Sequence, residues 1–263
     1  MKKNILFATF TIIALFLLSR ELPAGIPPGE ELFFQAGQAY KEGRFQEAAE
    51  GYEQLIQSGY VGGHLHYNLG NCYFRLNRLG QAILNYERAY LFIPRDADLN
   101  FNLGYTRDQT RDAVSQSRSF INMTFFWLNS LNRNEIFWGF ALLHGLFWLF
   151  LLVRLFSQSE WTYHAFLLLL IFWVIGGISF GLKMFQTKTD NRAIILKKEV
   201  NVQAGPDIHD IILFKIHEGT VLSHERSEDG WSLIRLPDQK RGWVKAEAIE
   251  NINQSSPCPT FGP

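Results

Sequence analysis

Residues able to carry metal, redox or nucleophilic chemistry are few and scattered in this chain. Its 263 residues include seven histidines and only two cysteines, Cys72 and Cys258, which are far apart. Neither cysteine belongs to a CxxC pair, and the sequence has no HExxH motif, phosphate-binding loop or nucleophile elbow. The sequence therefore predicts no catalytic residues, no metal site, no cofactor and no enzyme activity.

Two histidines, His144 and His164, lie in or beside long apolar runs, where paired imidazoles could hold a haem between facing helices. Opposed ligands of one haem need similar depths, whereas these two differ by roughly 13 Å at ~1.5 Å per residue. We therefore exclude a haem and expect His144 to make a hydrogen bond between two helices.

The two apolar runs, Ile136–Phe156 and Ala165–Leu182, are joined by the short polar link Ser157–Glu160. Each run holds about 18 residues with almost no charge, enough to cross the ~30 Å hydrocarbon core as a helix. A link this short returns the chain directly, so we predict an antiparallel transmembrane hairpin with helices at 136–156 and 161–183. The alternative is a pair of buried helices in a soluble core, for which neither flanking part is large enough.

Small residues lie four apart in each run, Ala141 with Gly145 and Gly177 with Gly181. This spacing allows close approach of helix backbones in lipid, which predicts that the two pairs meet. Glycine is also simply common in membrane helices, so the contact is one of two interpretations.

The N-terminus has the plan of an export signal. The basic start Met1–Asn4 precedes the apolar run Ile5–Leu18, and Ala24 offers a poor cleavage site. We interpret residues 1–24 as a signal peptide or N-terminal anchor, which puts both flanking parts in the periplasm at a bacterial inner membrane. The positive-inside rule opposes this, because four basic residues flank the hairpin on the outer side: Arg133, Lys183, Lys188 and Arg192. We follow the signal, since it commits the first part to export before the hairpin emerges.

Residues 30–118, which follow a proline-rich linker, contain an internal repeat. The interval from Ala48 to Ala82 equals the interval from Tyr52 to Tyr86. The Leu-Gly pair at 69–70 recurs after the same interval, at 103–104. This common interval is a period of 34, which with this layout is the signature of tetratricopeptide helix pairs. The region therefore resembles a tetratricopeptide repeat domain.

The second repeat, Leu65–Pro94, fits this pattern best, and the first, Leu32–Tyr60, fits well. The third begins at Ala97 and keeps only its first helix, which we expect to act as a cap. Gly70 is expected where the paired helices touch, and Pro94 where the second helix ends.

The resemblance implies a concave face lined by the first helix of each repeat. Phe33, Phe34, Tyr40 and Phe101 would be exposed there, although these aromatics could equally be core. On this face the tentative peptide-binding groove consists of Lys41, Tyr67, Asn68, Asn71, Phe74, Arg75, Asn102 and Tyr105. Its amides and cations resemble, incompletely, the carboxylate clamp of chaperone-binding members. The alternative is that the asparagines only cap and bridge neighbouring helices.

Residues 119–135 become aromatic toward their end, with Phe125-Phe126-Trp127 next to Leu128. Such a segment could lie in the membrane interface or pack as a capping helix, and the sequence does not separate the two.

Residues 190–252 change to short β-prone runs separated by turns, of which Asp229-Gly230 is one. The order of Asn-Val-x-x-Gly-Pro, Glu-Gly-Thr-Val and Arg-Gly-Trp-Val resembles the bacterial SH3-like domain, which implies a small all-β barrel. Trp231 and Trp243 would be barrel core or a ligand platform. The tail, 253–263, is polar and proline-rich and is expected to be disordered.

The fold class is therefore a multi-domain membrane protein, with a tetratricopeptide repeat domain, a two-helix hairpin and an SH3-like barrel. This order resembles the BatE group of the bacterial Bat (aerotolerance operon) proteins. The resemblance implies partners with von Willebrand A domains in the membrane and a chaperone-like ATPase. A formal net charge of zero argues against nucleic acid. We predict a protein-interaction scaffold of the cell envelope; the alternative is a peptidoglycan sensor acting through the SH3-like domain.

Overall fold

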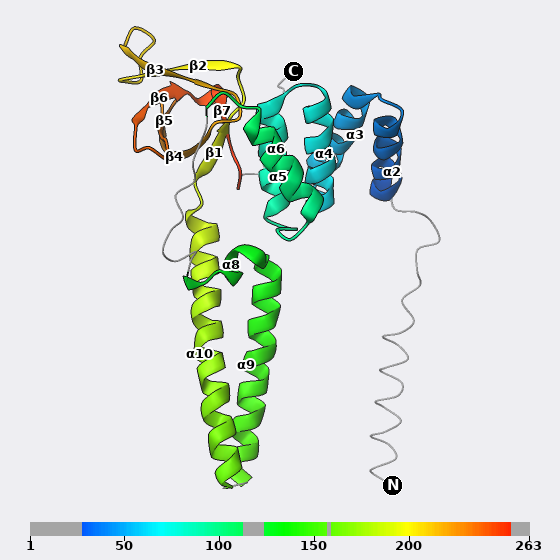
Figure 1. The fold of residues 1–263 in the computed structure, drawn as a ribbon, viewed down its shortest axis with the longest axis vertical. Coiled ribbons are helices and arrows are strands. Elements are labelled where there is room, and N and C mark those ends of the chain that lie inside the picture. Colours follow the sequence, from blue (N-terminus) through cyan, green and yellow to red (C-terminus); the bar gives the residue numbers. More distant parts are fainter. Residues whose placement is uncertain (1–27, 113–123, 157–158, 254–263) are drawn as a thin grey trace.

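The structure is a computed structural model that describes residues 28–112, 124–156 and 159–253. Three parts follow one another along the chain: a group of short helices, a long helical hairpin and a β-sheet (Figure 1). The predicted signal or anchor at 1–24 and nearly all of the predicted tail lie outside the described residues.

The short helices form two antiparallel pairs followed by a single helix: α2 (Pro28–Lys41) with α3 (Phe45–Gln57), α4 (Gly63–Arg75) with α5 (Leu79–Tyr90), and α6 (Ala97–Asp108). Helix α5 begins one repeat period after α3, and α6 begins one repeat period after α4, as the sequence predicts. Asp96 caps α6 by accepting a hydrogen bond of 2.8 Å from the Leu99 amide.

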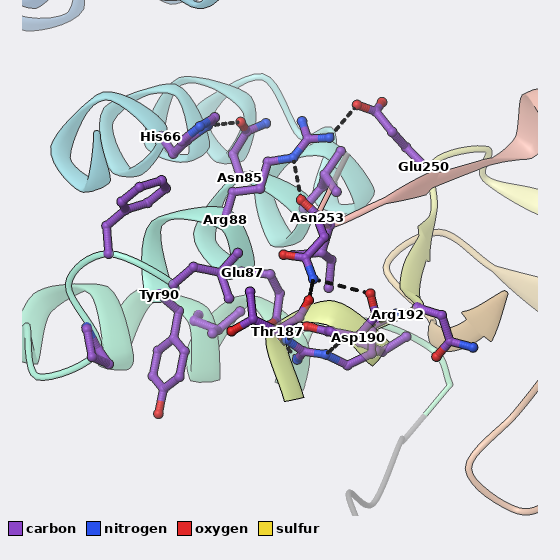
Figure 2. A pocket seen from close by; sticks show the side chains of 18 of the residues that line it. His66, Asn85, Glu87, Arg88, Tyr90, Thr187, Asp190, Arg192, Glu250 and Asn253 are labelled. Atoms are coloured by element: carbon purple, nitrogen blue, oxygen red, sulfur yellow. Dashed lines mark hydrogen bonds and ion pairs between the residues drawn. The ribbon is translucent and has the colours of Figure 1, made fainter. Parts of the chain in front are cut away.

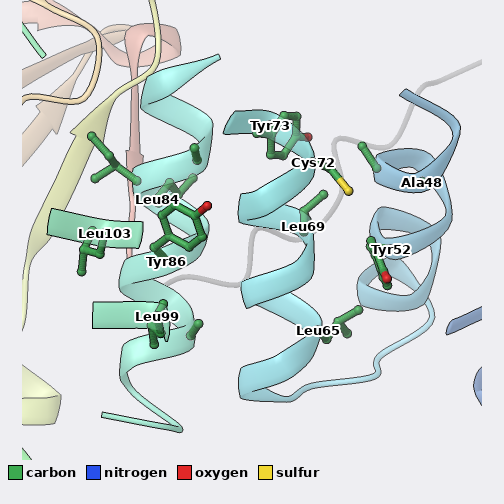
Figure 3. Close-up of a cluster of buried hydrophobic side chains, with 14 of the residues drawn as sticks. Ala48, Tyr52, Leu65, Leu69, Cys72, Tyr73, Leu84, Tyr86, Leu99 and Leu103 are labelled. Atoms are coloured by element: carbon green, nitrogen blue, oxygen red, sulfur yellow. The ribbon is translucent and has the colours of Figure 1, made fainter. Parts of the chain in front are cut away.

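The core of this part is made by leucine, tyrosine and small side chains, several of them at matching positions of the repeats (Figure 3). A Cβ atom added to Gly70 would lie 2.6 Å from the ring of Tyr86, so only glycine lets α4 approach α5 this closely. Tyr52 and Tyr86, which occupy the same position in successive repeats, are both buried. The predicted role of Gly70 is confirmed.

The hairpin consists of α9 (Arg133–Phe156) and α10 (Glu160–Thr189), which run antiparallel, and a one-turn helix, α8 (Trp127–Ser130), precedes it (Figure 1). Asn132 and Glu135 form a capping box, in which each side chain accepts a hydrogen bond of 2.9 Å from the other residue's amide. Both helices are long and apolar enough to cross a membrane, and little of either apolar stretch is buried within the protein.

The contact between α9 and α10 differs from the one that the small residues predict. Apart from the adjacent turns of their own helix, nothing in the described part lies within 4 Å of the Cβ positions of Gly145 and Gly181. Instead, Phe140 and Leu143 of α9 pack on Gly176 of α10, where an added Cβ would lie 3.0 Å from Leu143 Cδ2. Large side chains of one helix therefore fill the space left by a glycine of the other.

His144 makes the predicted hydrogen bond between the two helices. The indole Nε1 of Trp173 on α10 lies 3.0 Å from His144 Nδ1, and Trp148 Nε1 on α9 lies 2.9 Å from His144 Nε2. An indole only donates, and a neutral imidazole has one acceptor nitrogen, so one of the two contacts is a hydrogen bond at a time.

The C-terminal part is one antiparallel sheet: β1 (Arg192–Ile195), β2 (Glu199–Gln203), β3 (Ile212–His217), β4 (Val221–Glu228), β5 (Trp231–Arg235), β6 (Arg241–Lys245) and β7 (Ile249–Asn251), with a 3-10 turn, η1 (Ala246–Ala248), between the last two. The predicted turn between β4 and β5 has positive φ at both Asp229 (46°) and Gly230 (81°), the geometry that a two-residue hairpin requires.

The sheet is not the closed barrel that the sequence predicts. The strand order is β3-β2-β6-β5-β4-β1-β7, so β3 and β7 are its two edges and do not pair with each other. Strand β2 joins β6 through one residue pair, Gln203 with Trp243, next to a bulge in its pairing with β3. The β2–β3 hairpin has few backbone pairs with the rest of the sheet. Its side chains Val202 and Ile216 nevertheless belong to the buried cluster of the sheet, so the hairpin packs on that core although β3 and β7 do not pair to close a barrel.

The sheet and the repeats are packed against each other. Ile194, Val221 and Ile252 of the sheet belong to the buried cluster of the helical part. A Cβ atom added to Gly80 of α5 would lie 2.5 Å from the carbonyl oxygen of Ile195 in β1. The sheet therefore covers α5. The sequence predicts that the third repeat caps the repeat domain, but in the structure the sheet shares this role with α6.

Candidate interaction surface

The helical part has one face covered and one face open. The sheet covers α5, and hydrogen bonds join the turn after α5 to the base of the hairpin, including one of 3.0 Å from Asn132 Nδ2 to Phe92 O. Helices α2, α4 and α6 carry all eight predicted groove residues. We call the exposed side of these three helices the first-helix face.

Three of the predicted groove residues meet at the centre of this face. Asn71 Oδ1 accepts hydrogen bonds from the Tyr86 hydroxyl (2.8 Å) and from Asn102 Nδ2 (3.1 Å). Asn102 Nδ2 also lies 3.0 Å from the hydroxyl oxygen of Tyr67. Burial raises the pKa of the Tyr67 hydroxyl above its usual value, so this hydroxyl is neutral and able to donate at neutral pH. The cluster connects α4, α5 and α6.

Asn68, the third asparagine of the predicted groove, interacts with the side chain of Tyr52 on α3. All three asparagines thus bridge neighbouring helices, which is the alternative role that the sequence leaves open. A peptide-binding role for them stays a prediction.

The two predicted cations lie apart from this cluster. The Arg75 guanidinium lies 4.4 Å from the centre of the Phe45 ring, which is a cation–π contact. Lys41 is the last residue of α2 and is exposed. The hydrogen bonds of the asparagine cluster include neither cation, and a carboxylate-binding role for Lys41 and Arg75 stays a prediction.

Aromatic side chains give the first-helix face its apolar character. Phe101 and Tyr105 of α6 are stacked with ring centres 6.1 Å apart, and Phe74 of α4 lies 5.9 Å from Tyr105. Phe101 remains 70% exposed and Tyr105 53% exposed. Phe34 of α2 is 71% exposed on the same set of helices. Exposed aromatic groups of this size are characteristic of protein-binding surfaces.

The two predicted tryptophans of the sheet differ in burial. Trp243 in β6 is only 6% exposed, and the Arg226 guanidinium lies 5.2 Å from the centre of its ring. Trp231, at the start of β5, is partly buried. Trp243 therefore lies in the body of the sheet, where it offers little surface to a ligand.

A second feature, which the sequence does not predict, is a cavity of about 1740 Å³ between the helices, the sheet and the base of the hairpin (Figure 2). Its wall includes an ion pair of 2.7 Å between Arg88 and Glu250. Asn253 Nδ2 donates to the carbonyl oxygens of Thr187 (3.1 Å) and Asp190 (3.2 Å), which ties the end of the sheet to the end of α10. The residues come from distant parts of the chain, so no local pattern marks the cavity.

His66 is the one histidine of the cavity wall (Figure 2). Its Nδ1 lies 3.2 Å from Asn85 Oδ1, and Asn85 Nδ2 donates to the Gln81 carbonyl. Burial lowers the pKa of His66, so it is neutral at neutral pH. Among the described residues, no group of three or more histidine, cysteine or acidic side chains is arranged to hold a metal ion.

Glu87 joins α5, α6 and the sheet through a buried ion network. It is 2% exposed and accepts from Arg107 of α6 and, at 3.0 Å, from Arg192 of β1. Burial alone would lower the pKa of Arg192, but its hydrogen bonds to Asp190 and Glu87 raise that pKa above its ordinary value. Arg192 therefore stays charged beside the buried carboxylate of Glu87.

Comparison with known families finds a tetratricopeptide repeat at residues 63–96. The match covers α4, α5 and the turn that leads into α6, so the second predicted repeat is confirmed. No curated protein sequence matches the chain. The repeat is a non-catalytic protein-interaction motif, which indicates that this protein binds other proteins.

Proposed function

We propose that this protein is a membrane-anchored scaffold of the bacterial cell envelope that binds partner proteins on its first-helix face. The observation that carries the proposal is the asymmetry of the repeats: the sheet and the hairpin occupy one side, while Phe101 and Tyr105 stay exposed on the other. Resemblance to the Bat group makes membrane proteins with von Willebrand A domains the expected partners, and the SH3-like sheet is a second contact.

The hairpin supports membrane anchoring because the described part of the chain leaves most of its apolar side chains exposed. Trp138 of α9 is 70% exposed and Trp161 of α10 is 84% exposed. Water would oppose so much exposed apolar surface, whereas lipid would accept it. The N-terminal export pattern places the repeats and the sheet in the periplasm under this proposal.

The side of the membrane can be tested by cysteine labelling in a Cys258→Ser background. Under the proposal, Lys240→Cys on the sheet reacts with a membrane-impermeant thiol reagent in intact spheroplasts, while Ser159→Cys at the hairpin tip reacts only after permeabilisation. The reverse pattern would place both parts in the cytoplasm.

Partner binding is best tested with side chains that do not hold the helices together. Asn71 and Asn102 bridge three helices, so their removal would confuse binding with folding. We therefore choose the double variant Phe101→Ala, Tyr105→Ala and the control Val61→Ala, which removes an equally exposed side chain between α3 and α4.

Cells that contain each full-length variant are crosslinked, and the protein is purified from native membranes in mild detergent. Wild type and Val61→Ala should retain the same set of partners, including a von Willebrand A-domain protein, and the double variant should lose them. Retention of every partner by the double variant would mean that another surface, such as the sheet, makes the contact.

A further inference from the structure

The cavity of Figure 2 carries an excess of positive charge. Six cationic and four carboxylate side chains line it. The carboxylates already accept hydrogen bonds from arginine or tyrosine side chains: Glu53, Glu87, Asp190 and Glu250. Four of the cations are likewise paired with carboxylates: Arg88, Arg107, Arg192 and Arg235. The excess therefore comes from Arg133 and Lys183, which have no carboxylate within ion-pair distance in the part of the chain that the structure describes.

These two cations lie at the same level of the molecule. Arg133 is the first residue of α9, and Lys183 follows the apolar run of α10, which ends at Leu182. Lys183 Nζ donates to the carbonyl oxygens of Leu128 (2.6 Å) and Leu131 (2.8 Å), and Leu131 stands two residues before Arg133. Both cations therefore lie where the hairpin would leave the hydrocarbon core and the cavity begins.

We propose that this floor of the cavity binds the phosphate group of an anionic phospholipid from the adjoining leaflet. This inference rests on the proposed membrane anchoring. A guanidinium can bind a phosphate with two parallel hydrogen bonds, and Lys183 adds a point charge with one N–H not used by the two carbonyls. The carboxamides of Asn129 and Asn134, which also line the cavity, suit the hydroxyl groups of a glycerol headgroup.

The geometry also explains why a lipid is favoured over a soluble anion. The acyl chains of a lipid bound at this level would lie along the exposed apolar surface of the hairpin. One ligand would then contact both the two cations and the apolar surface below them. A cation near the membrane surface favours an anionic lipid by about five-fold.

The test uses the full chain in lipid nanodiscs that contain phosphatidylcholine with a minor fraction of phosphatidylglycerol. Lipids that stay bound after transfer to mild detergent are counted by native mass spectrometry. Wild type should retain phosphatidylglycerol above its bulk fraction, and Arg133→Gln and Lys183→Gln should each reduce this preference about five-fold. Lys188→Gln is the matched control, because Lys188 is exposed on the same helix and does not line the cavity.

Arg133→Gln is the decisive variant, since Lys183→Gln also removes the hydrogen bonds that hold α8. Retention of the two lipids in proportion to their bulk fractions would overturn the inference, as would an equal loss in Lys188→Gln. Displacement of the lipid by millimolar inorganic phosphate would overturn it in favour of a soluble anion. Failure of the chain to enter nanodiscs would refute the anchoring itself, whereas the partner-capture result has no bearing on lipid preference.

Discussion

At the scale of single residues, glycines decide how closely the parts of this molecule approach. Gly80 is a helical residue with no need for an unusual φ, yet a side chain there would meet the backbone of β1. Gly104 occupies a helix in the same part of the molecule, and apart from the adjacent turns of that helix nothing in the described residues lies within 4 Å of its Cβ position. Substituting alanine at each position therefore distinguishes two effects on stability. At Gly80 the new methyl group meets β1, whereas at Gly104 only the helix preference of alanine acts.

We expect Gly80→Ala to lower the free energy of unfolding by about 1–3 kcal/mol, because the carbonyl of Ile195 cannot move without disturbing β1. Gly104→Ala should be neutral or stabilise by up to about 1 kcal/mol, because alanine favours the helix. Denaturant unfolding of the purified chain in mild detergent, followed by circular dichroism, measures both. Equal midpoints for the two variants would show that the sheet does not pack on α5 in this way.

At the scale of elements, α4 is the centre of the helical part. It contacts α3 and α5, and its residues supply the asparagine cluster on one side and Cys72 on the other (Figure 3). Cys72 is fully buried, and burial raises the pKa of its thiol to about 12. The folded chain thus favours the neutral thiol and shields it from reagents.

In a Cys258→Ser background, Cys72 should react with a thiol reagent at pH 8 several orders of magnitude more slowly in the folded chain than in denaturant. The folded pKa is raised, so the contribution of Cys72 to stability is complete below the unfolded value of about 9 and declines as pH rises above it. Absorbance of the released reagent measures the reaction. Fast labelling of the native chain would mean that α3 and α4 separate readily.

At the scale of the whole molecule, polar contacts between distant segments hold the repeats, the hairpin and the sheet in one arrangement. Glu87 contributes one such contact with Arg107 and Arg192. Asp112, just beyond α6, contributes another: its carboxylate accepts hydrogen bonds from the His217 amide and the Thr220 hydroxyl, both 2.7 Å long. The sheet is therefore joined to α5 through Glu87 and to the segment after α6 through Asp112.

Glu87→Gln should lower the free energy of unfolding by about 3–5 kcal/mol, because it leaves two arginines without their shared buried carboxylate. Glu47→Gln is the matched control, since Glu47 pairs with Arg44 on an exposed surface, where such a pair contributes less than about 1 kcal/mol. Thermal unfolding of both variants in the same detergent makes the comparison. Similar losses would show that Glu87 is not the buried link described here.

The Asp112 contact should weaken in acid. Burial by itself raises the pKa of Asp112, but hydrogen bonds from Thr220 and His217 outweigh it and hold this pKa below the usual 3.8. A lowered carboxyl pKa gives stability that is complete above 3.8 and is lost as pH falls through the folded value. The midpoint of unfolding should thus fall more steeply below pH 4 in wild type than in Asp112→Asn. Parallel curves would contradict this.

The sequence by itself determined the features that depend on local spacing. The repeat interval between Tyr52 and Tyr86 defines two helix pairs because each repeat buries the same positions. The two apolar runs define long helices, and Asp229-Gly230 defines a tight turn, because these depend on neighbouring residues alone. The asparagines of the first-helix face were also found this way, although their bridging role was one of two interpretations.

Only the tertiary structure decided how these elements meet. Gly80 and Ile195 are far apart in sequence, and their contact depends on complementary shape, which leaves no periodic pattern. The two edges of the sheet follow from its strand order, and the cavity floor follows from where the base of the hairpin, with Lys183 and Arg133, meets the helices and the sheet. Each depends on the positions of whole elements, and those are set by the sum of many long-range contacts.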